Sequence, residues 1–385
     1  MCFNEGNPSF NLRWKIQASI IITFILQYNW MFTCKKERWN NSIPRNRMGH
    51  NNRSDHVHEI TPKNSNFATM NLFIYNALLL LFGFFSTLLI SIKAEESEPL
   101  PLPTVAYGKI VRFTDFPSKY VKPRNIDVLL PNGYSPKISY PVLYMHDGQM
   151  LFDDAHTWNH QEWGLDETLQ ELSDSLRPTI IVGIWNIDTF RRAEYFPEKA
   201  LQFLPDDIRK EFIEKELQGN PLGDEYVQFL TEEVKPFIEK MFSASTNPAD
   251  NLLMGSSMGG LISLYALCEY PQLFGGIAGL STHWPGSQLV KSPAIPQSIL
   301  TYLNQHLPIS SANKQIYIDT GTEGLDAEYL PYLEQMNMIC SKHGYDNQHY
   351  QSIIDEGADH NELAWRARLH LPLTFLFHQF SSQSR

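Results

Sequence analysis

The sequence predicts an α/β fold, with a mostly parallel central sheet flanked by helices. Three observations predict it. From residue 105 onward, short β-rich apolar runs alternate with longer stretches whose apolar residues recur every three or four positions. A Gly-x-Ser-x-Gly segment, Gly255 to Gly259, stands between one such run and one such stretch. The hydrophobic content of 43% and the charged content of 19% are typical of a globular enzyme.

Seven runs are predicted strands because they are short, apolar and rich in β-branched residues. They are Arg124–Leu130, Pro141–Met145, Thr179–Trp185, Asn251–Met254, Gly275–Leu280, Gln315–Asp319 and His349–Ile354. Five stretches with helical spacing lie among them, at Gly164–Leu172, Glu225–Met241, Gly259–Tyr270, Ala327–Lys342 and Asn361–Phe380. One domain over residues 95–385 accommodates all of them.

A leader precedes this domain. Residues 70–92 are apolar and carry no charge, and a small residue, Ala94, stands before an acidic, proline-containing stretch. This order is typical of a signal peptide over 70–94 and indicates export. The apolar run also reaches the length of about 20 residues that spans a bilayer, so an uncleaved membrane anchor stays open.

Residues 1–69 show no sustained period, and we expect no fold there. A start at Met70 would give a more ordinary exported protein, so the first 69 residues are either unstructured or an over-extended gene model. The acidic and histidine-containing cluster Asp55 to Glu59 has metal-binding residue types, but a solvated linker is the simpler interpretation.

The charge of the domain excludes nucleic acid as a partner. Residues 1–94 carry ten Lys/Arg against four Asp/Glu, a net +6, which leaves 21 basic and 38 acidic residues in 95–385, a net −17. Phosphates require a basic surface, which a domain this acidic does not provide.

Four cysteines give no zinc spacing and no disulfide framework. Cys2 and Cys34 belong to the leader, while Cys268 and Cys340 fall in predicted helices. We expect the latter two to be buried thiols rather than a bridge.

Ser257 is the predicted nucleophile. The Gly-x-Ser-x-Gly segment follows an apolar strand and opens a helix, which is the setting of a nucleophile elbow. The turn strains the serine backbone and projects its hydroxyl outward, and its glycines leave room for it. Centring the pattern on Ser256 would require glycines where Met254 and Met258 stand, so the register selects Ser257.

A serine nucleophile needs a general base and an acid that orients it, which in the α/β-hydrolase fold follow in the order Ser, Asp or Glu, His. His360 is the predicted base, because it stands on a loop beyond the carboxyl end of a strand. Asp326 is the predicted acid and Glu323 the alternative, since both follow the strand that ends at Asp319. Asp319 itself is expected to be buried at that strand end.

Several further segments resemble the "Putative esterase" family of α/β-hydrolases, which includes enterochelin esterases, S-formylglutathione hydrolases, feruloyl esterases and mycolyltransferases. The similar segments lie at 116–120, 124–131, 144–149, 251–260, 319–329 and 357–365. The resemblance covers essentially all of the chain after the leader. It implies the α/β-hydrolase fold and esterase activity.

The resemblance also implies two oxyanion donors, the backbone N–H groups of Gln149, after an Asp-Gly pair, and of Met258, after the nucleophile. Many relatives place the acid directly after Gly-Thr-x, where this chain has Gly324. That departure leaves the choice between Asp326 and Glu323 open.

Aromatic residues on predicted loops above the sheet are candidates for the substrate pocket. They are Trp185, Tyr195 and Trp284, with Tyr195 and Trp284 taken as the substrate-binding candidates.

Together these features predict an exported serine carboxylic-ester hydrolase that needs no metal and no organic cofactor. Its expected partner is a small-molecule or carbohydrate ester, and residues 70–92 allow membrane association. An acyltransferase that passes the acyl group to an alcohol is the alternative, and an inactive binding module of the same fold is a third. A long-chain lipase is disfavoured, because no apolar lid insertion is visible.

Overall fold

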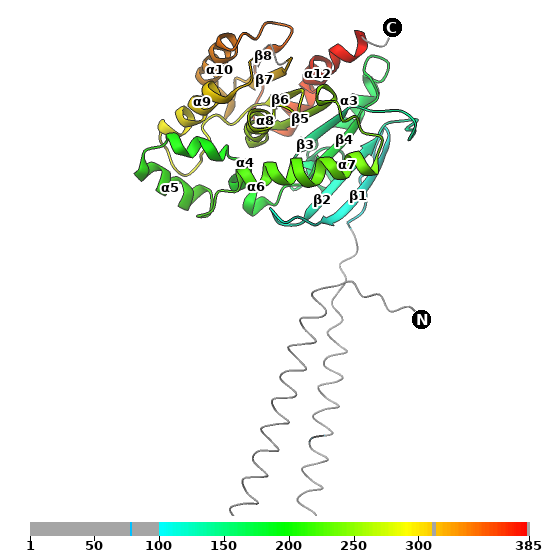
Figure 1. Ribbon diagram of the computed structural model, residues 1–385, viewed down its shortest axis with the longest axis horizontal. Coiled ribbons are helices and arrows are strands. Elements are labelled where there is room, and N and C mark those ends of the chain that lie inside the picture. Colours follow the sequence, from blue (N-terminus) through cyan, green and yellow to red (C-terminus); the bar gives the residue numbers. More distant parts are fainter. Residues whose placement is uncertain (1–77, 79–99, 310–312, 383–385) are drawn as a thin grey trace, which may run out of the picture. The chain divides into compact units, whose positions relative to one another are not determined.

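A computed structural model describes Leu78 and residues 100–309 and 313–382 (Figure 1). Predictions that concern residues 1–69, Cys2, Cys34, the 55–59 cluster and, apart from Leu78, the 70–94 leader fall outside these ranges. Within the ranges that are described, no helix has both the length and the apolar character needed to cross a membrane. The described residues from Leu100 onward belong to one unit, Glu98–Arg385.

Eight strands form one sheet in the order β1-β2-β4-β3-β5-β6-β7-β8. Their bounds are β1 Lys109–Phe116, β2 Arg124–Leu130, β3 Val142–His146, β4 Ile180–Ile184, β5 Asn251–Ser256, β6 Gly276–Leu280, β7 Gln315–Gly321 and β8 Tyr350–Asp355. β1 and β2 pair in an antiparallel manner with each other, and β2 pairs so with β4. The pairs from β4 through β8 are all parallel, so their carboxyl ends meet at one edge.

The α-helices are α3 Leu165–Glu171, α4 Arg191–Tyr195, α5 Asp206–Glu216, α6 Gly223–Gln228, α7 Lys235–Met241, α8 Met258–Glu269, α9 Ala294–His306, α10 Leu330–Lys342, α11 Glu362–Arg368 and α12 His370–Ser382. Short 3-10 turns occupy η1 Gly148–Met150, η2 Asp154–His156, η3 Asp188–Phe190, η4 Glu198–Phe203, η6 Pro248–Asp250 and η8 Asp326–Glu328. A π-helical segment, η5 Phe229–Val234, joins α6 to α7.

Two apolar clusters cover the two faces of the sheet, because successive strand side chains point to opposite sides. In β3, Tyr144 belongs to the cluster that contains α8, α9 and α10, while Leu143 and Met145 belong to the cluster that contains α3 and α12. Figure 1 shows the same layers, with α8 and α9 on one face and α12 on the other. Helices on both faces of a parallel sheet are the predicted architecture, and the prediction is confirmed.

Each of the seven predicted strands is present, with bounds that differ by at most two residues at either end. β1 was not predicted, because an edge strand with the burial of KIVRFTDF exposes too many polar side chains to show an apolar pattern. α9 was not predicted either: its Pro296 lies in the first turn, where proline is tolerated, but in a sequence it suggests a break. The predicted helix over 361–380 is observed as α11 and α12.

Cys268 and Cys340 are free thiols, as expected. Cys340 is buried, whereas Cys268 is partly exposed. Asp319 is fully buried at the end of β7, also as expected.

Candidate active site

Ser257 lies in the tight turn between β5 and α8, at the carboxyl edge of the sheet. Its backbone has φ 54° and ψ −121°, a conformation that non-glycine residues adopt rarely and at a cost of about 1–3 kcal/mol. Ser256 is buried within β5, whereas Ser257 is partly exposed. The geometry therefore offers the hydroxyl of Ser257, and not that of Ser256, to a ligand.

Close packing and three backbone hydrogen bonds hold the strained turn. A Cβ on Gly255 would lie 2.7 Å from the carbonyl carbon of Gly259, so no larger residue fits there without a shift. The Ser257 N–H donates to the carbonyl of Leu280 over 2.8 Å. Its carbonyl accepts from the N–H groups of Gly260 and His283, each over 3.1 Å.

Asp326 and His360 come together from two loops at the same edge. The His360 Nδ1 lies 2.6 Å from the Asp326 Oδ1, a short bond for a nitrogen donor. Asp326 is fully buried, and the His360 side chain is 14% exposed. Glu323, the alternative acid, has an exposed side chain, and within the described chain no hydrogen bond or ion pair joins that side chain to His360.

The surroundings of Asp326 favour its ionised form. Burial alone would raise its pKa, but hydrogen bonds from His360, Ser281 and the Gly321 N–H, the last over 2.7 Å, outweigh burial and hold the pKa of Asp326 below its ordinary value. An ionised carboxylate at this position stabilises a positive charge on the imidazole of His360.

Two aromatic rings clamp the imidazole of His360 edge to face. Its centroid lies 5.7 Å from the ring of Tyr329, at an interplanar angle of 90°, and 5.1 Å from the ring of Trp365, at 84°. Rings in this arrangement attract through their quadrupoles. The ring orientation of His360 is thus fixed on both sides as well as through Nδ1.

The turn after β3 carries Gln149. Asp147 adopts the left-handed conformation with φ 59°, and Gly148 then lies directly on β4, where a Cβ would be 2.4 Å from the carbonyl carbon of Gly183. Gln149 is partly exposed, and its Oε1 accepts from the N–H of Asn186 over 3.1 Å. Met258 opens α8, so its N–H is one of the first four of the helix, which have no partner inside it.

Asp147 is anchored by residues that the sequence did not single out. Its carboxylate accepts from Arg191 Nε over 2.8 Å, from Arg191 Nη2 over 2.7 Å and from Asn186 Nδ2 over 2.6 Å. Burial would raise the pKa of Asp147, and the Arg191 charge outweighs burial and lowers it. In the sequence, the one feature that could have indicated this contact is that Asn186 and Arg191 follow β4, the strand next to β3.

Two buried histidines flank the candidate nucleophile without being ionised near neutral pH. Burial lowers the pKa of His146 to about 4 and the pKa of His283 to about 3. His146 Nδ1 lies 2.8 Å from the hydroxyl of Tyr226, and His283 Nδ1 lies 2.5 Å from the hydroxyl of Tyr329. Both rings therefore act as neutral packing and hydrogen-bonding groups.

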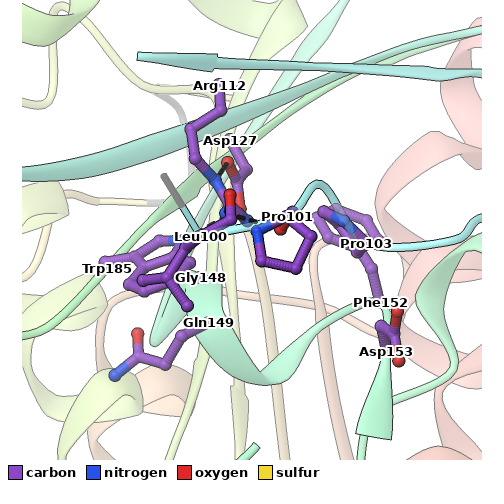
Figure 2. A pocket seen from close by; sticks show the side chains of 10 residues that line it. All are labelled: Leu100, Pro101, Pro103, Arg112, Asp127, Gly148, Gln149, Phe152, Asp153 and Trp185. Carbon is purple, nitrogen blue, oxygen red and sulfur yellow. Dashed lines mark hydrogen bonds and ion pairs between the residues drawn. The ribbon is translucent and has the colours of Figure 1, made fainter. Parts of the chain in front are cut away.

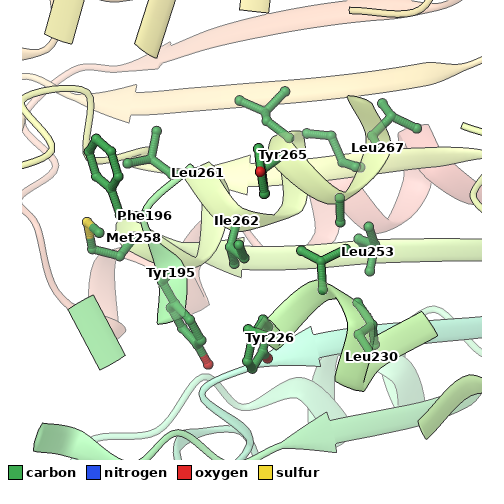
Figure 3. Packing of buried hydrophobic residues seen from close by; sticks show 14 of the residues in the cluster. Tyr195, Phe196, Tyr226, Leu230, Leu253, Met258, Leu261, Ile262, Tyr265 and Leu267 are labelled. Atoms are coloured by element: carbon green, nitrogen blue, oxygen red, sulfur yellow. The ribbon is translucent and has the colours of Figure 1, made fainter. Parts of the chain in front are cut away.

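The expectation that Tyr195 and Trp284 line the substrate pocket is wrong for this structure. Both side chains have 0% exposure and belong to the apolar cluster on the α8 face. Figure 3 shows Tyr195 among Tyr226, Ile262 and Met258. The Tyr195 hydroxyl instead accepts from the N–H of Asp147 over 3.4 Å, beneath the turn that carries Gln149.

Trp185, by contrast, lines a small surface pocket beside Gln149 (Figure 2). The pocket is formed by Leu100, Pro101, Pro103, Arg112, Asp127, Gly148, Gln149, Phe152, Asp153 and Trp185. Its polar side chains are largely satisfied internally: Arg112 Nε and Nη2 reach the carboxylate of Asp127 over 2.6 and 2.8 Å, and Trp185 Nε1 reaches it over 2.9 Å.

In the part of the chain that the structure describes, no cluster of three or more His, Cys, Asp or Glu side chains has an arrangement suited to a metal ion.

Comparisons with known proteins place the fold and the family. Residues 119–376, more than half of the chain, match the family described as "Putative esterase". Protein YbbA of Bacillus subtilis, described as uncharacterized, is 24% identical over 245 residues, which are 62% of this chain and 86% of YbbA.

Two solved structures have similar folds. A ferulic acid esterase is 18% identical with a TM-score of 0.50, covering 70% of this chain and 98% of the esterase. An IroE-like serine hydrolase from Shewanella oneidensis is 20% identical with a TM-score of 0.51, covering 72% of this chain and 82% of the hydrolase. The α/β-hydrolase fold expected from the sequence is thereby confirmed. The chain belongs to the "Putative esterase" family and is a carboxylic-ester hydrolase.

Proposed function

We propose that the chain hydrolyses esters through a Ser257–His360–Asp326 triad and an acyl-enzyme. The observation that carries the proposal is the strained φ of 54° at Ser257, in a turn at the same sheet edge as the 2.6 Å contact between His360 and Asp326. Strain of this kind persists only where the surrounding structure enforces it, and it gathers at functional sites.

In the first half of the reaction, Ser257 Oγ attacks the ester carbonyl carbon as its proton passes to Nε2 of His360. Nδ1 is occupied by Asp326, so Nε2 is the nitrogen available as the base. The tetrahedral intermediate collapses when the alcohol oxygen leaves with the proton of His360. In the second half, water gives a proton to His360 and attacks the acyl carbon. The second tetrahedral intermediate then collapses to the acid, and Ser257 Oγ leaves with that proton from His360.

The N–H groups of Gln149 and Met258 stabilise the oxyanion in this proposal. Each is the first or second residue of a helical turn at the carboxyl edge of the sheet, and neighbouring N–H groups of such turns attract negative charge. The bidentate Arg191 contact to Asp147 and the packing of Gly148 on β4 keep the first of these donors in place.

We propose that the apolar walls of the pocket in Figure 2 contact an uncharged part of the ester. Arg112 and Asp127 neutralise each other at its base, and Leu100, Pro101 and Trp185 supply apolar walls. The net charge of −17 over residues 95–385, from 21 basic and 38 acidic residues, also disfavours an anionic substrate. Trp185→Ala is expected to raise KM for such esters several-fold and to leave kcat within about twofold.

The test is hydrolysis of p-nitrophenyl acetate and of neutral aromatic esters by the wild type, Ser257→Ala and the neighbouring Ser256→Ala. Hydrolysis that Ser257→Ala abolishes and Ser256→Ala retains is the expected result. Equal rates in the wild type and Ser257→Ala would exclude the triad. Product analysis with an added sugar or alcohol acceptor distinguishes water from an alcohol as the second nucleophile, and an acylated acceptor as the main product would favour the acyltransferase.

We propose export on the basis of the uncharged apolar run over residues 70–92 and the small residue Ala94. Amino-terminal sequencing of the protein recovered from expressing cells is the test. A mature chain that begins near Glu95 supports cleavage, and membrane-bound protein that retains residues 70–92 supports an anchor.

A further inference from the structure

Ser281 lies between the candidate acid and the helix that follows the candidate base. It is the first residue after β6, it is fully buried, and its hydroxyl bonds to the Oδ2 of Asp326. The same Oγ accepts from Trp365 Nε1 over 2.9 Å and from Arg368 Nη2 over 2.8 Å. Three elements, the β6 end, η8 and α11, therefore converge on one oxygen.

The direction of each of these hydrogen bonds is fixed by chemistry. A serine hydroxyl has one proton to donate and two lone pairs that accept. Indole Nε1 and guanidinium Nη2 can only donate, so Trp365 and Arg368 fill both lone pairs of Ser281. The hydroxyl proton must then point to Asp326.

Oδ2 of Asp326 therefore acts only as a hydrogen-bond acceptor. It accepts from the Ser281 hydroxyl and from the Gly321 N–H over 2.7 Å, which leaves Oδ1 to face His360 Nδ1. Because the lone pairs of Ser281 are filled, the acid cannot bond to it as a protonated donor. The arrangement fixes the rotation of the carboxylate and leaves no acceptor for a proton on its Oδ2.

A buried ion pair holds Ser281 from behind. Arg368 Nη2 lies 3.0 Å from Asp319 Oδ1, and the same Oδ1 accepts the N–H of Ser281 over 2.9 Å. Both Arg368 and Asp319 are at most 2% exposed. Arg368 is also 4.0 Å from Oδ2 of Asp326 and 3.4 Å from Asp355. Hydrogen bonds thus hold Ser281 through both its backbone N–H and its side-chain hydroxyl.

We propose that Ser281 is a positioning residue, which orients Asp326 so that Oδ1 holds the Nδ1 proton of His360. Its catalytic meaning rests on the proposed function, since it acts through the triad. Trp365 has a double role, because its Nε1 fixes the Ser281 hydroxyl while its ring packs against His360.

The backbone of Ser281 supplies a way to separate the hydroxyl from mere folding. Its φ is 42°, a left-handed value that glycine adopts without strain. Ser281→Gly relieves the backbone and removes the hydroxyl, whereas Ser281→Ala removes the hydroxyl and keeps the strain. Ser298→Ala is the matched control, a buried serine of α9 that donates to the carbonyl of Ile295 over 2.7 Å.

The experiment measures ester hydrolysis and, by proton NMR, the resonance of the proton on His360 Nδ1, which His360→Gln assigns by its loss. For Ser281→Ala and Ser281→Gly we expect kcat to fall about 10- to 100-fold, the loss of one hydrogen bond to a charged group, with KM little changed. The His360 Nδ1 resonance should move upfield in both, as its bond to Asp326 loosens. Ser298→Ala should match the wild type in both measurements.

Two outcomes overturn the proposal. One is an unchanged or downfield-shifted His360 resonance in Ser281→Gly, and the other is wild-type kcat in that variant, because it too lacks the hydroxyl. If the wild type hydrolyses no ester yet the resonance moves upfield in both Ser281 variants, the proposed function fails while the positioning role stands. Thermal unfolding of each variant confirms that the compared proteins are folded.

Discussion

Replacing the carboxylate of Asp326 by an amide, in Asp326→Asn, tests whether Asp326 is the acid of the triad. Three donors surround the carboxylate, namely His360 Nδ1, the Ser281 hydroxyl and the Gly321 N–H. A carboxylate accepts all three, whereas an amide offers one oxygen and an NH₂ group that only donates. In either orientation of the amide, at least one donor therefore faces another donor.

The larger consequence concerns the tautomer of His360. If the amide NH₂ faces Nδ1, that nitrogen must become the acceptor, and the proton moves to Nε2, where it blocks acceptance of the Ser257 proton. In a serine protease the equivalent change lowers kcat about 10⁴-fold, and we expect a loss of about that size here. Because Asp326 is 0% exposed, water cannot bond to the donor that the amide leaves unpaired.

The assay compares kcat for p-nitrophenyl acetate in the wild type, Asp326→Asn and Glu323→Gln. Glu323 is the matched control, since it precedes Asp326 by three residues but has an exposed side chain. We expect Glu323→Gln to stay within about twofold of the wild type. A large loss in Glu323→Gln together with a small one in Asp326→Asn would show that Glu323, and not Asp326, is the acid.

Three further predictions concern a turn at the candidate site and two buried carboxyl groups. Gly148→Ala places a Cβ 2.4 Å from the carbonyl carbon of Gly183, so the turn before Gln149 must move. Steady-state kinetics should then show kcat about 10²- to 10³-fold lower, as for the loss of one oxyanion donor. A kcat within threefold of the wild type would contradict the assignment of the Gln149 N–H as a donor. In the wild type, Arg124 lies 2.6 Å from a carboxylate oxygen of Glu194, and Glu194→Gln leaves the buried charge of Arg124 without a counter-charge. Chemical denaturation should show a loss of about 3–5 kcal/mol in the free energy of unfolding. A loss below about 1 kcal/mol would show that this ion pair does not stabilise the fold. Burial raises the pKa of Asp166 to about 7, so the stability that this carboxyl contributes is present below its unfolded pKa near 4 and is lost as the pH rises through about 7. Asp166→Asn should therefore be thermally more stable than the wild type at pH 8 and not at pH 4. An equal difference in thermal stability at both pH values would show that burial does not raise this pKa.

The candidate site residues that the sequence singled out are those that depend on local order. The Gly255 to Gly259 segment must turn tightly wherever a strand leads into a helix, so the register of two glycines selects Ser257. His360 follows because the carboxyl ends of parallel strands meet at one edge. Each inference used a short segment and a rule about chain direction.

Side-chain exposure could not be predicted in the same way. Tyr195 and Trp284 stand in segments that do lie at the sheet edge, but whether a ring faces a pocket or the core depends on what packs on it from elsewhere. The contacts that bury Tyr195 come from Tyr226, 31 positions later, and from His146, 49 positions earlier. No local pattern encodes such distances.

The residues that support the candidate acid, Asp326, were missed for the same reason. Ser281 and Arg368 are 87 positions apart, and in the sequence Arg368 looks like any basic residue in the last turn of a helix. Only the fold shows that its guanidinium is buried against Asp319. One sign is visible in the sequence, since Ser281 directly follows β6, which neighbours the strand that leads to Ser257.

The most direct test of the central claim is covalent labelling by a fluorophosphonate, followed by peptide mass spectrometry of the labelled chain. We expect one adduct on Ser257, no adduct in Ser257→Ala, and a strongly lowered labelling rate in His360→Gln. Labelling of another residue, or equal labelling of the wild type and Ser257→Ala, would contradict it.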